Sequence, residues 1–306
     1  MKKIITFFAI ALLGGALLTF FAVSKKQPLQ SQSGKIVVSS SFYPLAEFAK
    51  QVGGDKIEVI NITPVGIESH DYEPTPRDIV AIRTSRLFLF QGANFDPWAE
   101  RVAKDISGSN MATINMADNF DLMSAEAGKK DPHFWLDPIL AKKEINIIRD
   151  ELKKIDPSNA AVYEGNAQKF SASLDVLDSA IRFSLSDCSL SEIIVSHGAF
   201  GYFAARYGLQ VTSISGISPD IEPSAQMLGE IAKMAKEKNI HYIFFETLAS
   251  PKLAETVAKE AGIQTSVLNP VEGLTPEDVS MGKNYLSIME ENLHNLEQAL
   301  QCQNKK

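Results

Sequence analysis

The sequence is poor in the residues and motifs from which the commonest metal and redox sites are built. Its 306 residues contain two cysteines and five histidines. Neither cysteine has a partner in a C-x-x-C pair, which argues against a thiolate metal site. The chain has no H-E-x-x-H segment, which argues against a zinc hydrolase of that type. Basic residues are not in excess, and the formal net charge of −7 argues against a nucleic-acid partner.

The amino-terminal residues have the pattern of an export signal. Residues 4–23 are uncharged and are flanked by Lys2-Lys3 and Lys25-Lys26. This run is longer than the roughly 7–15 residues of a cleavable signal core and close to the roughly 20 that span a bilayer, although Ala22-Val23-Ser24 would suit cleavage. We expect residues 1–33 to be a signal sequence or membrane anchor with a polar tether, and no lipid attachment near residue 24. The rest would lie in the periplasm or at the extracytoplasmic face of the membrane.

The remaining chain alternates strand-like and helix-like segments. With 45% hydrophobic and 22% charged residues, the composition is that of a globular protein, and the length allows two domains. Alternating segments predict a largely parallel sheet with helices on both faces. In the first half we expect strands at 35–40, 57–62, 86–91 and 112–115, and helices at 43–52, 76–84 and 97–107.

A long helix is expected to separate this half from a second one. Residues 139–155 are amphipathic, and Ser158 can then cap a helix that runs to about residue 185. Such a helix would be about 42 Å long, enough for a rigid strut. The alternation restarts with strands at 193–195, 210–214, 242–245 and 266–268 and helices at 199–207, after Ser224, at 251–261 and at 283–301. The sequence thus predicts an α/β fold with a lobe over 34–157, a linker helix over 158–187 and a second lobe over 188–306.

Three of the five histidines lie in loops that follow predicted strands. His133 stands between two Asp-Pro pairs in Asp131-Pro-His-Phe-Trp-Leu-Asp-Pro, and proline stiffens such a loop. His70 and His197 also follow apolar runs. Because parallel sheets bind ligands beyond the carboxyl ends of their strands, we expect the three to share one metal site.

Three histidines leave one position of a tetrahedral zinc site to be filled. The carboxylates that follow predicted strands are Glu246, Glu272, Asp220 and Glu222, and spacing alone does not rank them. Glu246 could instead hydrogen-bond loop amides. A secreted zinc hydrolase would keep the fourth position for water, with Glu246 or Asp220 as its base.

Four segments resemble the metal-binding segments of the zinc/manganese solute-binding proteins of metal ABC importers. They are His70-Asp-Tyr-Glu-Pro-Thr, Asp131-Pro-His-Phe-Trp-Leu-Asp-Pro, Ser196-His-Gly-Ala-Phe and Leu268-Asn-Pro-Val-Glu-Gly-Leu. The similarity runs in order over about residues 35–302 and is closest to the zinc-binding branch that includes the laminin-binding adhesins. The sequence departs from the family pattern in one respect. Residues 123–130 lack the histidines that many zinc-binding members carry before the second ligand.

The resemblance implies that His70, His133, His197 and Glu272 bind the metal and that one rigid helix joins the two lobes. Imidazole ligands suit zinc better than manganese, so zinc is expected and manganese is the alternative. The implied function is an extracytoplasmic zinc receptor, not an enzyme, that delivers the ion to a membrane permease. We expect a monomer, and an adhesin role stays open.

Cys188 and Cys302 leave two possibilities. In an exported protein they can form a disulfide, but they can equally be two separate buried thiols.

Overall fold

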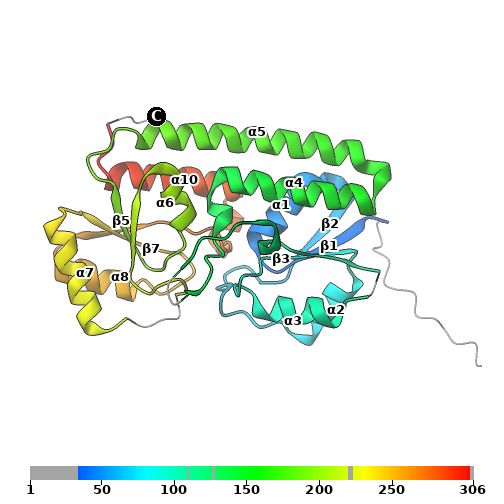
Figure 1. Ribbon diagram of the computed structural model, residues 1–306, viewed down its shortest axis with the longest axis horizontal. Coiled ribbons are helices and arrows are strands. Elements are labelled where there is room, and N and C mark those ends of the chain that lie inside the picture. Colours follow the sequence, from blue (N-terminus) through cyan, green and yellow to red (C-terminus); the bar gives the residue numbers. More distant parts are fainter. Residues whose placement is uncertain (1–33, 109, 126–127, 220–222, 304–306) are drawn as a thin grey trace, which may run out of the picture. The chain divides into compact units, whose positions relative to one another are not determined.

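The computed structural model describes residues 34–108, 110–125, 128–219 and 223–303 (Figure 1). Residues 35–306 form one compact unit. The predicted signal or anchor over residues 4–23 lies outside the described residues. Within the described ranges, no helix combines the length and apolar character needed to cross a bilayer.

The first lobe is built on a parallel four-stranded sheet in the order β2-β1-β3-β4. Its strands are β1 (Ile36–Ser40), β2 (Ile57–Asn61), β3 (Leu87–Phe90) and β4 (Ala112–Asn115), and its connecting helices are α1 (Tyr43–Gly53), α2 (Pro76–Thr84) and α3 (Pro97–Asp105). Helix α2 begins where the sequence predicts, because Thr75 and Asp78 form a reciprocal capping box around Pro76. Short 3₁₀ turns η1 (Gly54–Lys56), η2 (Ala117–Asn119) and η4 (Phe134–Leu136) complete this part.

The second lobe repeats this topology, as predicted. Its parallel sheet has the order β6-β5-β7-β8. The strands are β5 (Glu192–Val195), β6 (Gln210–Ser213), β7 (Tyr242–Phe245) and β8 (Gln264–Val267), and the helices are α6 (Gly201–Tyr207), α7 (Ala225–Glu237), α8 (Lys252–Ala261) and α9 (Pro276–Ser280). Ser224 caps α7 through its side chain. Helix α9 was not predicted, although Thr275 and Asp278 form a capping box there.

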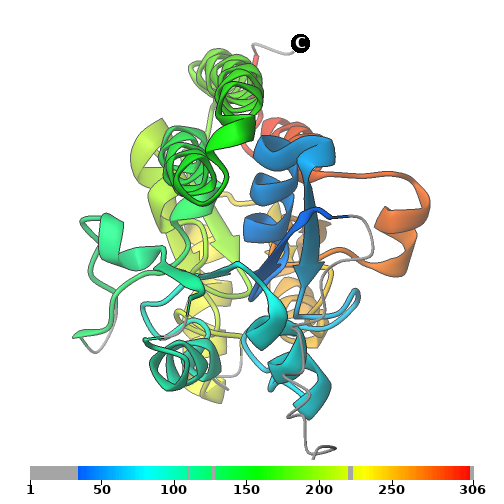
Figure 2. The same ribbon diagram turned by 90° about the vertical axis from the view of Figure 1, so that its right-hand side faces the viewer.

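Three long helices pack together beside the sheets. They are α4 (Pro138–Ile155), α5 (Ala160–Leu185) and α10 (Tyr285–Ala299), and α5 extends over elements of both lobes in Figure 1. Figure 2 shows α4 and α5 side by side next to α1. The long helix is confirmed, but the predicted cap at Ser158 is wrong. Ser158 lies in a 3₁₀ turn, η5 (Pro157–Asn159), where its hydroxyl donates to Asp156, and α5 begins after that turn.

One hydrophobic core continues from the first lobe into the second. Strand β3 shows how the sheets are covered, because Leu87 and Leu89 face this shared core while Phe88 and Phe90 face a separate cluster beneath α2 and α3. The second sheet likewise has one face on the shared core and the other on α7 and α8. The lobe boundaries at 157/158 and 187/188 stay a prediction.

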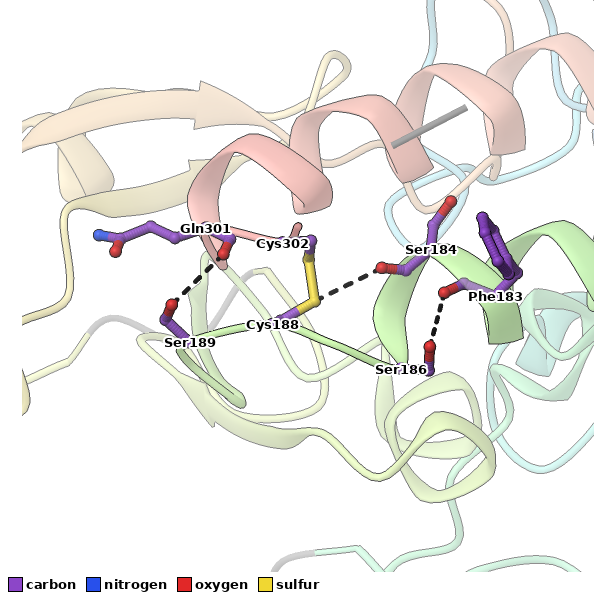
Figure 3. Close-up of a disulfide and its surroundings, with 7 residues drawn as sticks. All are labelled: Phe183, Ser184, Ser186, Cys188, Ser189, Gln301 and Cys302. Atoms are coloured by element: carbon purple, nitrogen blue, oxygen red, sulfur yellow. Dashed lines mark hydrogen bonds between the residues drawn. A yellow bond between two sulfur atoms is a disulfide. The ribbon is translucent and has the colours of Figure 1, made fainter. Parts of the chain in front are cut away.

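A disulfide between Cys188 and Cys302 closes the carboxyl-terminal part of the chain (Figure 3). It joins the segment that follows α5 to the segment that follows α10. Around it the two segments pair as strands do, with the N–H of Leu190 donating to the carbonyl of Leu300 at 3.1 Å. The structure thus contains the bridge rather than two separate thiols.

Candidate metal centre

The three loop histidines and Glu272 meet at the carboxyl ends of the strands. His70 lies between β2 and α2, His133 between β4 and α4, and His197 directly after β5. Glu272 lies in the loop that follows β8. Two of the four side chains therefore come from each lobe, and one ligand atom of each lies within 4.8 Å of the others.

The spacing of these atoms matches a tetrahedral metal site. Oε1 of Glu272 is 3.5 Å from Nε2 of His70, 3.5 Å from Nε2 of His133 and 3.3 Å from Nε2 of His197. Nε2 of His70 and Nε2 of His133 are 3.4 Å apart. A tetrahedron with metal–ligand distances of about 2.1 Å has edges of about 3.4 Å. Four of the six edges of the tetrahedron therefore have the length that a zinc-sized ion needs, and the remaining two are within 4.8 Å.

The site is buried, with one side less closed than the others. The side chains of His133, His197 and Glu272 are at most 2% exposed, whereas that of His70 is 8% exposed. His70 also lines a cavity of about 670 Å³, together with Phe95 and Lys130 from the first lobe and with residues from the second. This cavity therefore reaches the site at His70.

Two carboxylates orient two of the histidines. Oδ1 of Asp131 lies 2.8 Å from Nδ1 of His133 and accepts the backbone N–H of the same residue at 2.9 Å. Oε1 of Glu246 lies 2.8 Å from Nδ1 of His197. Because a carboxylate accepts hydrogen bonds, each Nδ1 carries a proton and each Nε2 faces the metal position. The predicted loop-amide role of Glu246 is thus replaced by a contact to a candidate ligand.

The surroundings of His133, His197 and Glu272 shift the pKa of each side chain in a different way. Burial lowers the pKa of His133 below its usual range, and Asp131 offsets only part of that effect. Burial also opposes a charge on His197, but the carboxylates of Glu246 and Glu272 outweigh it and raise its pKa well above the usual range. Burial opposes ionisation of Glu272 as well, yet His70 and His197 hold its pKa well below the usual range. The metal-free site thus keeps an anionic Glu272 beside a protonated His197.

The loop that carries Glu272 is held in an unusual backbone conformation. Val271 has φ +58°, a left-handed conformation that a β-branched residue rarely adopts. Oδ1 of Asn269 accepts the backbone N–H of Val271 at 2.8 Å, and Asn292 on α10 bonds both the N–H and the carbonyl of Asn269. Trp135 of the other lobe donates its indole N–H to the carbonyl of Pro270 at 2.8 Å. These bonds fix the backbone immediately before Glu272.

Sequence reasoning missed Glu68, which comes two residues before His70. Its Oε1 accepts the backbone N–H of His70 at 3.1 Å. Burial, together with the negative charge of Glu272, raises the pKa of Glu68 to about 9. No predicted strand end or motif points to Glu68, because its place depends on how the two lobes meet. The other predicted carboxylates, Asp220 and Glu222, lie outside the described residues.

Comparisons with known proteins agree with this geometry. The sequence model of a family described as zinc-uptake complex component A, periplasmic (ZnuA), matches residues 38–299. The chain belongs to this family. The high-affinity zinc uptake system protein ZnuA of Bacillus subtilis is 38% identical over 291 residues, which cover 90% of this chain and 91% of that protein.

Two streptococcal proteins show the same likeness. The zinc-binding lipoprotein AdcA of Streptococcus pneumoniae is 37% identical over 94% of this chain, which spans only 60% of the length of AdcA. The Zn(II)-bound ZnuA-like domain of AdcA superimposes with a TM-score of 0.78 at 39% identity, covering 87% of this chain and 99% of that domain. The laminin-binding protein Lmb of Streptococcus agalactiae, described as an adhesin with metal-transporting activity, gives a TM-score of 0.80 at 32% identity, with coverage of 87% and 99%. The expected fold and family are confirmed.

Proposed function

We propose that this protein is an extracytoplasmic receptor that captures zinc and delivers it to the membrane permease of an ABC importer. The observation that carries the proposal is the near-tetrahedral set of Nε2 atoms of His70, His133 and His197 with Oε1 of Glu272. Zinc is the cargo of this site and not a resident cofactor. The zinc-uptake and zinc-binding names of the similar proteins support the same assignment.

The ligand set supports zinc over manganese and transport over catalysis. Three imidazoles and one carboxylate suit zinc, whereas manganese favours sites richer in oxygen. A zinc hydrolase needs a coordination position for water, but in the proposed site Glu272 would take the fourth corner. We therefore propose no enzymatic activity, and manganese is the less favoured cargo.

Zinc would hold the two lobes together, because two of its ligands come from residues 34–157 and two from residues 188–306. The shared core and α5 would keep any opening of the lobes small. The proposed receptor acts as a monomer, with the permease as its partner. The disulfide supports an oxidising, extracytoplasmic location, and the charge pattern of residues 2–26 supports export, with or without retention as an anchor.

The test is the metal content of the purified protein, measured by elemental analysis and by competition between zinc and manganese. We expect one tightly held zinc per chain, lost on His133→Ala. His294→Ala is the matched control, because the side chain of His294 is 79% exposed on α10, and it should keep the zinc. No bound zinc, or a preference for manganese, would contradict the proposal.

A further inference from the structure

A second group of potential ligands lies against the histidine site and consists only of carboxylates. Glu68, Glu246 and Glu272 each place one oxygen within 4.8 Å of the others. They come from three different loops, after β2, β7 and β8. Glu272 belongs to both groups, so the two sets of ligands meet at one side chain.

Each of the three glutamates has a carboxylate oxygen that is buried and accepts no hydrogen bond from a neighbouring donor in the described part of the chain. Within the described residues, Oε2 of Glu68, Oε2 of Glu246 and Oε2 of Glu272 are fully buried and unpaired. The side chains of Glu246 and Glu272 are only 4% and 1% exposed. A buried, unpaired carboxylate oxygen is costly in free energy unless a cation or a donor faces it. A cation bound among the three side chains would give these oxygens a partner.

The charges point the same way. The ion pairs of Glu246 and Glu272 within the described ranges are all with histidine. Within these ranges no Lys or Arg side chain forms an ion pair with either carboxylate.

We propose that Glu68, Glu246 and Glu272 form a second cation site, which holds a hard divalent cation beside the zinc. Oxygen-only ligand sets suit manganese, calcium and magnesium, whereas the histidine set suits zinc. Glu272 bridges the two ions through its two oxygens, as carboxylates do in two-metal sites with ions about 3.5–4 Å apart. This proposal depends on the proposed zinc site, because Glu272 belongs to both ligand sets. Its role is to neutralise Glu272 and Glu246 and so to tune how firmly zinc is held.

The test is a titration of the zinc-loaded protein with manganese, with free Mn²⁺ followed by electron paramagnetic resonance and zinc measured in the same samples. We expect one added manganese per chain, with zinc retained. Glu68→Gln should weaken manganese binding by about tenfold or more, since loss of a ligand costs at least as much as loss of an outer partner. The zinc content of this variant is measured in the same samples, so that a loss of manganese alone is distinguished from a loss of both ions.

Glu73→Gln is the matched control, because Glu73 is an exposed glutamate of the same loop that pairs with Arg101. It should bind both ions as the wild type does. The proposal is overturned if manganese does not bind to the zinc-loaded wild type, if it displaces zinc instead of adding to it, or if Glu68→Gln binds it unchanged. A wild type that holds no zinc would instead contradict the proposed transport function.

Discussion

Glu246 and Glu272 both contact His197, but at different nitrogens of its ring. Glu272 places an oxygen at a corner of the tetrahedron, whereas Glu246 holds Nδ1 of His197. Loss of an outer carboxylate typically costs 10–100-fold in metal affinity, and loss of a direct ligand costs more.

The two roles predict an order of effects on zinc affinity. Glu246→Ala should weaken zinc binding by about 10–100-fold, and Glu272→Ala should weaken it further. The measurement is a competitive titration of each variant against a zinc chelator of known affinity. A larger loss in Glu246→Ala than in Glu272→Ala would contradict the assignment of Glu272 as the fourth ligand.

At this scale the sequence revealed the histidines but not their partners. His133 could be singled out because two Asp-Pro pairs stiffen its loop, and Asp131 lies in the same segment. Glu246 is 49 residues from His197, and the two meet only because β7 pairs with β5. The left-handed backbone conformation of Val271 could not be predicted from the sequence either. Valine seldom adopts this conformation, and the hydrogen bonds that hold it come from Asn269 and from α10.

Among the helices, α4 contains a buried acid that the metal site does not use. Glu144 is fully buried, and neither of its carboxyl oxygens has a hydrogen-bond partner among the described residues. Its position four residues from both Leu140 and Ile148 places it on the apolar face of the helix. Burial raises the pKa of Glu144 well above its ordinary value of 4.5.

This acid makes the stability of the protein depend on pH. In the unfolded chain Glu144 loses its proton near pH 4.5, while in the folded protein it keeps the proton to a much higher pH. Between the two pKa values the unfolded chain binds fewer protons, so the free energy of unfolding falls as pH rises through that window. Glu144→Gln removes this contribution of Glu144 to the pH dependence of stability. Its Tm should exceed that of the wild type at pH 8, and the difference should shrink toward pH 4.5.

Thermal unfolding across that pH range checks the prediction. Glu290→Gln serves as the control, because Glu290 is exposed on α10 and its substitution should leave the pH profile unchanged. A wild type and a Glu144→Gln variant with parallel pH profiles would show that Glu144 is ionised in the folded protein. The sequence pattern places Glu144 on the apolar face, but it does not show that the facing elements leave both oxygens unpaired.

For the whole molecule, the disulfide is the longest-range covalent constraint. It joins residues 114 positions apart and thereby restricts most of the second lobe in the unfolded chain. Replacing both cysteines by serine should lower the free energy of unfolding by about 2–5 kcal/mol. Denaturant unfolding of the oxidised wild type and of the double variant measures this difference. Zinc stoichiometry should stay at one per chain, and equal stability of the two proteins would contradict the prediction.

The overall topology was the most predictable feature, because alternating strands and helices admit few arrangements. The alternation predicted parallel sheets, but it did not predict the strand order that the two sheets share. The single core was not predictable, since it depends on α1, α4, α5, α6 and α10 packing against one another across both lobes. The boundaries that the sequence suggests therefore divide the sheets but would cut through the packed interior.

This continuous interior has a consequence for when the protein can first hold metal. The ligands extend from His70 to Glu272, and the core that supports them includes Leu296 and Leu300 near the end of the chain. A chain that crosses a membrane from its amino terminus therefore has no complete site until almost all of it has emerged. If the chain is exported unfolded, as the charge pattern of residues 2–26 suggests, we expect it to bind zinc only on the side of the membrane where it emerges.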